Sequence, residues 1–510
     1  MTGIPGPELS RGRRWAALAV LTASLLVITM DMTILNIALP DMAADLHPTS
    51  DQQLWIIDVY SLVLAGLLVS WAAIGDRWGR KRMLMLGYLI FAVASVLVLF
   101  ADSAGMVIAI RAFLGVGGAM IMPTTLSLIR VIFTDAGERA AALGVWAAVS
   151  GLGAAVGPLV GGLLLEHFSW HAAFLINVPL MLVAIIAGIW LLPESRVSDP
   201  GRWDALGAAL SLVGMVALVW SIKQFGKYAA LDLPEAWMAL GVAAATLAWF
   251  AVRCLRSDKP LLDLGLFENR RFSAGIIAAL GSTFSLIAVL LLVVQWLQLV
   301  DGATALEAGV RLIPIALASA AASMLAPPLS GLLGARAVLA GGLVFSAAGM
   351  LLIGLSRQEL DLTIVLVSLV LVGAGTGSLA IGSALIMSGS PEEKAGNAGA
   401  LEETSYELGG TLGVAVLGSI SALIYRSRLV ADEHFQALQQ VEPELAGQVK
   451  ESLGAAVSIA DGLGQPELAA KAGDAFTRSL EVTGLVGGAL MLLVAVLVFA
   501  MVPKGTSVAH

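Results

Sequence analysis

The chain has 510 residues, of which 58 % are hydrophobic and only 13 % are charged. A water-soluble domain carries about 25 % charged residues, so this composition and the mean hydropathy of +0.90 exclude a soluble globular protein. The net charge of −8 identifies no partner, because the charged residues lie in short segments between long apolar runs. The single cysteine, Cys254, excludes an internal disulfide and a cysteine-rich metal site.

Long apolar segments recur along the whole chain. A helix needs roughly 20 apolar residues to cross a bilayer, and fourteen segments meet this requirement. We therefore predict an all-α polytopic membrane protein with fourteen transmembrane helices. The predicted spans lie near 15–40, 54–74, 83–101, 105–130, 138–165, 171–193, 204–222, 236–255, 273–299, 308–334, 336–356, 361–387, 396–425 and 479–503.

The spacing of these spans predicts four parts. We expect an N-terminal tail at 1–14, a six-helix bundle at 15–193, an inserted two-helix hairpin at 204–255 and a second six-helix bundle at 273–503. Two such bundles facing each other across a cavity are typical of secondary transporters. The second bundle includes a long loop at 426–478, which is either a cap over the outer mouth or a tolerated insertion.

Lysine and arginine residues concentrate in alternate short loops. The loop between the second and third spans holds four of them at 77–82, whereas 41–53, 102–104 and 166–170 hold none. Because positively charged loops stay in the cytoplasm, we predict that both termini are cytoplasmic. The membrane is then a bacterial-type inner, or plasma, membrane.

Three ionisable residues fall inside the first spans. Asp31 lies about nine residues from Pro40, or roughly 13 Å along a helix, which is deep for a short side chain in hydrocarbon. It is either functional or a carboxyl group that reaches water near the helix end. Arg111 needs a partner, for which Asp31 is one candidate, and its role is either structural or in coupling. Asp58 lies one turn inside the second span and is either functional or a wetted helix end.

The thirteenth span carries Glu402, Glu403 and Glu407 within six residues. Glu403 and Glu407 are four residues apart and share a helix face. Because several like charges in a low-dielectric environment do not all ionise, such a cluster is suited to carrying a proton and to attracting a cation. The alternative is a helix that lies partly outside the bilayer.

Two other motifs are predicted to shape the backbone and the helix packing rather than to bind a substrate or a proton. Gly75, Asp76, Arg77, Gly79 and Arg80 form a tight, basic loop in which the aspartate can pair with a base or with a helix N-terminus. In the fifth span small residues allow close helix packing and the proline bends the helix; these residues are Gly153, Gly157, Pro158, Gly161 and Gly162.

Among the deeper aromatic residues, Trp146, Trp296 and Tyr406 are candidates for lining a cavity and offering ring faces to an organic cation. Core packing is the alternative for each of them. The chain contains no glycine-rich phosphate-binding motif of the ATPase type. We therefore expect no cofactor, no metal and no enzyme activity, and a transporter driven by an ion gradient or by the gradient of its own substrate.

These motifs resemble the major facilitator superfamily, in its fourteen-span branch of drug:proton antiporters. The resemblance covers nearly the whole chain. It is carried by the first-span signature at 31–40, the loop motif at 75–82 and the antiporter motif at 144–162. The segments at 55–60 and 402–407, with the long loop before the last span, are most similar to exporters of quaternary ammonium compounds and cationic dyes.

The resemblance implies proton-coupled efflux of lipophilic cations by alternating access, and hence antibiotic resistance. It implies a monomer in the lipid bilayer whose partners are small hydrophobic cations and protons, with no nucleic acid. The residues it places in proton coupling or substrate-charge recognition are Asp31, Asp58, Arg111, Glu402, Glu403 and Glu407. An exporter of an endogenous antibiotic or a lipid-linked metabolite is the alternative within the same class, and a membrane enzyme or a receptor is the alternative outside it.

Overall fold

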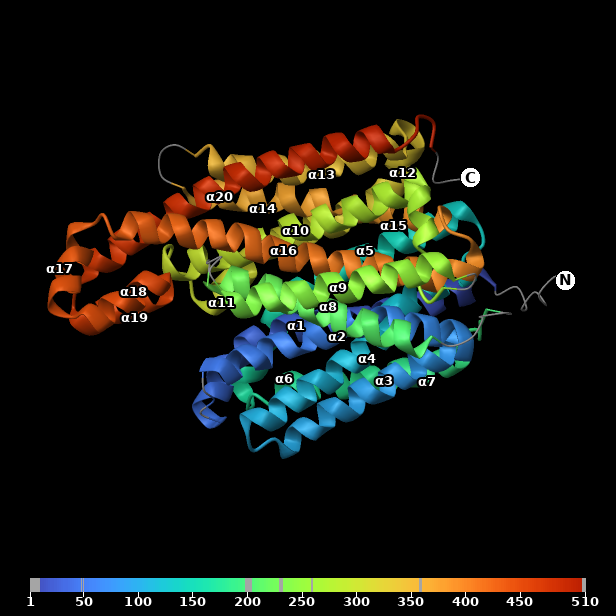
Figure 1. Ribbon diagram of the computed structural model, residues 1–510, viewed down its shortest axis with the longest axis horizontal. Coiled ribbons are helices and arrows are strands. Elements are labelled where there is room, and N and C mark those ends of the chain that lie inside the picture. The colour runs from blue at the N-terminus through green and yellow to red at the C-terminus, as the bar shows by residue number, and fades with distance from the viewer. Residues whose placement is uncertain are drawn as a thin grey trace.

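The computed structural model describes residues 10–506, except 47, 49, 198–203, 229–232, 258–259 and 357–359. Inside helices, it describes the backbone alone at 36, 37, 40, 43, 44, 50, 51, 54, 151, 154, 155, 158, 226–228, 305, 392 and 451. All regular elements in these ranges are helices (Figure 1). A helix satisfies its own backbone hydrogen bonds, which is what an apolar segment requires in lipid.

The first group of helices precedes residue 192, and the hairpin follows it. The helices of this group are α1 (Arg11–Leu46), α2 (Ser50–Trp78), α3 (Arg80–Leu97) continued by the 3₁₀ turn η1 (Val98–Phe100), α4 (Ala104–Ile132), α5 (Ala136–His167), α6 (Ala172–Leu175) and α7 (Asn177–Leu191). The hairpin consists of α8 (Ala205–Tyr228) and α9 (Pro234–Arg256).

The second group begins with a 3₁₀ turn and ends with the last helix of the chain. Its elements are η2 (Leu264–Glu268), α10 (Arg270–Leu299), α11 (Ala305–Arg311), α12 (Ile313–Leu333), α13 (Ala335–Gly354), α14 (Leu362–Thr376), α15 (Leu379–Ser388), η3 (Glu392–Lys394), α16 (Ala395–Leu429) and α20 (Pro466–Met501). Three short helices separate α16 from α20; they are α17 (Glu433–Val441), α18 (Pro443–Glu451) and α19 (Leu453–Leu463).

Within the described residues, thirteen helical segments are long and apolar enough to cross a membrane. Each of them overlaps one of the predicted spans. The remaining predicted span, 138–165, coincides with α5, a continuous helix of 32 residues. The fold is therefore the predicted all-α polytopic membrane fold of two six-helix bundles and an extra hairpin.

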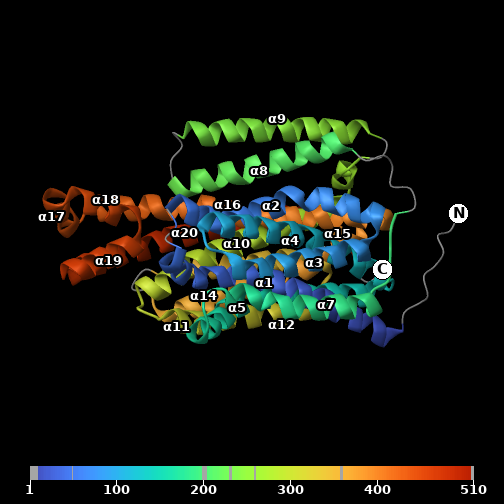
Figure 2. The same ribbon diagram turned by 90° about the horizontal axis from the view of Figure 1, so that it is seen from below.

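Helices α1 to α7 pack mainly on one another, as do α10 to α16 with α20. The two groups meet where α5 contacts α12 and where α2 and α4 contact α16. Helix α8 lies against α2 and α16, and α9 covers the outer side of α8 (Figure 2). The inserted hairpin therefore lies along a seam between the two groups.

The three short helices α17, α18 and α19 project from one end of the bundle (Figures 1 and 2). The flanking helices extend into the predicted loop 426–478, since α16 continues to Leu429 and α20 begins at Pro466. The short helices are amphipathic, with Phe435 and Leu438 buried. The Tyr425 hydroxyl donates to the Val449 carbonyl oxygen at 2.9 Å and ties α16 to α18. We call this end of the molecule the cap end.

Helix α1 starts and helix α20 finishes at the opposite end of the bundle (Figure 1). We call this the terminal end. Several helices start with a polar side chain that binds the free backbone N–H groups of the first turn. The Asp135 carboxylate accepts from the Glu138 backbone N–H at 2.8 Å, and Thr304 forms a capping box with Glu307. Polar residues outside the apolar runs thus set where these helices begin.

Candidate functional site

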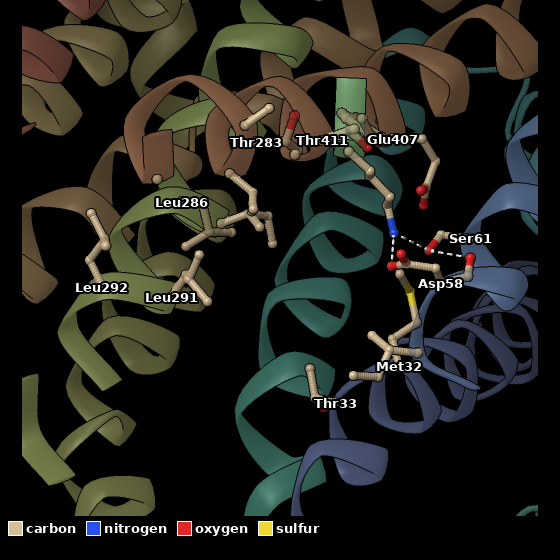
Figure 3. Close-up of a pocket in the computed structure, with 18 of the residues that line it drawn as sticks. Met32, Thr33, Asp58, Ser61, Thr283, Leu286, Leu291, Leu292, Glu407 and Thr411 are labelled. Carbon is tan, nitrogen blue, oxygen red and sulfur yellow. Dashed lines mark hydrogen bonds and ion pairs between the residues drawn. The ribbon is translucent and has the colours of Figure 1, made fainter. Parts of the chain in front are cut away.

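A cavity of about 740 Å³ lies between the two groups of helices. Helices α1 and α2 contribute to it from the first group, and α10 and α16 contribute from the second (Figure 3). Leu453 and Phe476 line it as well, so the cavity extends towards the cap end. Its wall is mostly apolar, with residues such as Met32, Leu286 and Leu291. A pocket of this size and character fits a drug-sized apolar molecule.

Two of the three acidic residues that line this cavity have partly exposed side chains. Asp58 on α2 and Glu407 on α16 both line it, and both side chains are half-buried. Asp58 forms an ion pair with Lys223 of α8, whose ammonium group also lies 3.5 Å from Ser61 Oγ (Figure 3). The structure therefore brings two of the predicted acidic residues together with a lysine that the sequence analysis placed in a loop.

Glu403 has a different environment from Glu407, although the two share a helix face. It is among the residues that line the cavity, yet its side chain is 0 % exposed. Neither of its carboxyl oxygens has a hydrogen-bond partner among the described residues. A buried polar group without partners is costly, and more so when it is charged. Glu403 is thus held just behind the cavity surface with nothing to stabilise a negative charge.

Glu402 points away from the cavity and is not among the residues that line it. It accepts a hydrogen bond from the Tyr406 hydroxyl at 2.6 Å and another from the Ser383 hydroxyl of α15. Its second oxygen has no partner in the part of the chain that the structure describes. The three glutamates therefore have three different environments. Glu407 lies in the cavity wall, Glu403 lies just behind it, and Glu402 is buried within the second group of helices.

Two of the three candidate aromatic residues line the cavity. Trp146 of α5 stacks on Tyr406 of α16, with ring centroids 6.3 Å apart and an interplanar angle of 27°. The pair bridges the two groups of helices. The third candidate, Trp296, is buried and is not among the residues that line this cavity; its indole N–H donates to Thr477 Oγ1 of α20 at 3.1 Å.

Asp31 and Arg111 pair with each other inside the first group of helices. Arg111 Nη1 donates to Asp31 Oδ2 at 2.9 Å, and Asn177 Nδ2 donates to Asp31 Oδ1 at 2.7 Å. Arg111 also donates to the Ile56 carbonyl oxygen at 3.2 Å and lies 4.7 Å above the Tyr60 ring. Neither member of the pair lines the cavity. In this conformation Asp31 is therefore out of reach of a molecule in the cavity.

The loop motif between α2 and α3 forms a compact latch at the terminal end. Asp76 accepts from Arg80 Nε at 2.9 Å, and its carboxylate also lies against Gly396 in the first turn of α16. A carboxylate at a helix N-terminus is favoured by the helix dipole. Because α2 and α16 belong to different groups, this contact joins the groups at the terminal end. Arg77 donates to the Ala73 carbonyl oxygen at 2.9 Å, and a methyl group on Gly75 would lie 3.4 Å from the Met83 side chain.

Gly79 has a backbone conformation that suits only glycine, with φ of 124°. A methyl group there would lie 2.7 Å from Glu194 Oε1. We expect Gly79→Ala to lower the free energy of unfolding by about 1–3 kcal/mol, measured by thermal unfolding of the purified protein. Gly105→Ala is the matched control, since a methyl group there meets no atom within 4 Å. Equal stability of the two variants would contradict the prediction.

The glycines of α5 allow close packing on α1. Methyl groups on Gly153 and Gly157 would overlap the hydroxyl groups of Thr29 and Thr33, respectively. Gly161 is buried, whereas a methyl group on Gly162 would meet nothing within 4 Å. The side chain of Pro158 lies outside the described residues.

The sequence profile of the Major Facilitator Superfamily matches residues 21–414. The match covers well over half of the chain and includes the latch, the α5 glycines and the glutamates of α16. The chain belongs to the major facilitator superfamily.

Relatives within the superfamily are similar along almost the full length. The chain is 40 % identical over 500 residues to the multidrug efflux pump LfrA of Mycolicibacterium smegmatis, covering 97 % of this chain and 98 % of that protein. It is 37 % identical to the methyl viologen resistance protein SmvA of Salmonella typhimurium, covering 95 % and 97 %. It is 34 % identical to the tetracenomycin C resistance and export protein of Streptomyces glaucescens, covering 81 % and 77 %.

Two solved structures of transporters share the fold. The human organic anion transporter MFSD10 matches with a TM-score of 0.61 at 14 % identity, covering 95 % of this chain and 99 % of that one. A bacterial homologue of the lysosomal transporter Spinster matches with a TM-score of 0.57 at 17 % identity, covering 98 % and 100 %. At this identity the likeness extends to the fold alone.

Three residues that bind the predicted acidic side chains were not predicted from the sequence, and of these only Lys223 lines the cavity. Lys223 forms an ion pair with Asp58. Asn177 donates a hydrogen bond to Asp31, and Ser383 donates one to Glu402. Lys223 was assigned to a loop because charge normally marks the end of a span. Asn177 and Ser383 carry no signal in one sequence, since single polar residues are common in packed membrane helices.

Proposed function

We propose that the protein exports lipophilic cationic drugs, dyes and quaternary ammonium compounds in exchange for protons. The observation that carries this proposal is the placement of Asp58, Glu403 and Glu407 in or just behind the wall of a large apolar cavity. Carboxyl groups at membrane depth are rare and lie on ion and substrate pathways. The apolar wall accommodates the organic body of the substrate and the carboxylates balance its charge.

In the proposed cycle the two groups of helices rock to expose the cavity to alternate sides. In this structure the cavity reaches the cap end, while the terminal end is closed by the latch and by Arg130, whose Nη2 donates to the Ser390 carbonyl oxygen at 2.5 Å. We assign the terminal end, with both chain ends, to the cytoplasm and the cap end to the outside of a bacterial plasma membrane. The protein acts as a monomer.

The exchange is driven by protons that enter from the cap end. Glu407 balances the charge of the cation, and a proton taken up by the Glu403–Glu407 pair removes the negative charge that holds the cation, so the cation leaves outward. After the cavity reopens inward, the pair loses the proton and a new cation binds. A charge moving down the membrane potential gains about 2.3 kcal/mol per 100 mV. If one monovalent cation leaves for each proton that enters, no net charge crosses the membrane. The electrical energy gained by the proton then equals the energy spent on the cation, and the pH gradient alone drives export.

The names of the relatives support this range of substrates. LfrA is named as a multidrug efflux pump, and SmvA is named for resistance to methyl viologen, an organic cation. The second candidate function is export of an antibiotic made by the host cell, which the likeness to the tetracenomycin C exporter favours. A binding screen of the purified protein against neutral and cationic compounds separates the two candidates.

Proton release on cation binding is the direct test. Adding ethidium to the purified protein in weakly buffered solution above neutral pH should release protons in proportion to the bound dye, because a cation and a proton compete for the same carboxyl groups. A neutral ligand should release none. Binding of ethidium without a change in pH would contradict proton-coupled export.

A further inference from the structure

The inserted hairpin contributes one helix face to the cavity. Trp220, Lys223 and Gln224 of α8 all line it, and residues three and four apart share a helix face. Helix α8 reaches the cavity because it lies in the seam between α2 and α16. The predicted span ended at 222, whereas α8 continues to Tyr228, so Lys223 belongs to the helix and faces inward.

The ammonium group of Lys223 already neutralises one of the carboxylates that a cationic substrate would use. It pairs with Asp58, and Glu407 lies on the same side of the cavity (Figure 3). The Lys223 and Asp58 side chains are 25 % and 30 % exposed, so both can be reached by a molecule in the cavity. An ion pair with this exposure contributes little to stability. The pair is therefore easily exchanged and is a poor structural support.

We propose that Lys223 is a tethered counter-cation that occupies the substrate-charge site of the empty cavity and that an exported cation must displace. This inference rests on the proposed function and adds a residue that determines specificity. A small hydrated inorganic cation gains from Asp58 only the attraction that Lys223 already supplies. A lipophilic cation also removes apolar surface from water against Trp220 and Leu286. Lys223 thus favours cations that carry an apolar body.

The test is the affinity of the purified protein for tetraphenylphosphonium, a monovalent lipophilic cation. Lys223→Met removes the competing charge and should lower the dissociation constant about five-fold, the upper range for an exposed pair. Lys223→Arg keeps the charge and should bind as the wild type does. The double variant D58N/K223M should not show this lower dissociation constant, because the Asp58 carboxylate that binds the cation is also removed. Nile red, a neutral lipophilic dye, should bind the wild type and Lys223→Met equally.

The chain offers a matched control in Arg311→Met. Arg311 pairs with Asp301, the two side chains are 27 % and 26 % exposed, and neither residue lines the cavity. This variant should leave the affinity for tetraphenylphosphonium unchanged. A gain in affinity from Arg311→Met equal to that from Lys223→Met would overturn the inference, because the effect would then be one of overall charge.

A second measurement avoids any effect of the substitution on folding. Cys254, the single cysteine, is buried and is first replaced by serine. Lys223→Cys in that background is then labelled after folding, either with aminoethyl methanethiosulfonate, which restores an ammonium group, or with neutral methyl methanethiosulfonate. The neutral label should give about five-fold tighter tetraphenylphosphonium binding than the charged label. Equal binding by the two labelled forms would overturn the inference.

Failure of this inference can be told apart from failure of the proposed function. If the wild type binds tetraphenylphosphonium and releases protons, but Lys223→Met binds no tighter, only the role of Lys223 is wrong. If neither protein binds the cation, both proposals are wrong. If Lys223→Met binds the cation where the wild type does not, Lys223 is a competitor of the kind proposed.

Discussion

Changing Glu403 to glutamine is expected to abolish uphill export of a cationic dye while leaving binding of the dye close to the wild-type value. Glu403 is fully buried behind the cavity wall, and neither of its oxygens has a partner among the described residues. Such a carboxyl group is suited to holding a proton and poorly suited to touching a cation. Glutamine has nearly the same shape but cannot release a proton, so the driving force is lost.

Glu407→Gln is the informative comparison, because Glu407 lines the same cavity but is partly exposed. Loss of this counter-charge should weaken dye binding by about ten-fold or more, as for other charged contacts. Dye export by proteoliposomes with an imposed pH gradient and equilibrium dye binding are measured for both variants. Glu444→Gln, on the exposed surface of α18, is the control that should change neither. Undiminished export by the Glu403 variant would rule out a proton-carrying role for this residue.

The fold was largely predictable because hydropathy is summed over about 20 residues and tolerates errors in single positions. The ends of helices were harder to predict. Helix α8 continues past Lys223, whose charge suggested a loop, because Asp58 supplies a partner within the cavity. Helix α20 begins at Pro466 rather than near 479, because its first turns are polar and lie beyond the apolar stretch, next to α19. Charge marks the edge of the apolar region and not the end of the helix.

The direction in which a side chain faces was the least predictable part of the site. A membrane helix is apolar both towards lipid and towards its neighbours, so no hydrophobic face distinguishes the two. The sequence left Trp296 either in the cavity wall or in the packed core, and the structure shows its indole N–H donating to Thr477. Glu402 and Glu403 are adjacent in the chain yet have different surroundings. Glu402 is the one that accepts hydrogen bonds from Ser383 and Tyr406, and only the packing of the helices determines this.

The second large effect concerns the pair inside the first group of helices. Replacing Arg111 by methionine should lower the free energy of unfolding by about 3–5 kcal/mol, because it leaves a buried charge without its partner. Asp31 is 0 % exposed and would keep only the bond from Asn177. Thermal unfolding of the purified protein measures the change. Arg253→Met is the control, since its pair with Asp204 is at the surface and should contribute at most about 1 kcal/mol.

Removing both charges should recover much of the lost stability, since the double variant D31N/R111M leaves neither member of the buried pair as an unpaired charge. Asp31 and Arg111 lie outside the cavity wall. The double variant should therefore still bind lipophilic cations, whereas Glu407→Gln should not bind them well. If the double variant is folded but has lost cation binding, Asp31 must contact the substrate in another conformation. If Arg111→Met is as stable as Arg253→Met, the buried ion pair does not hold α1, α4 and α7 together.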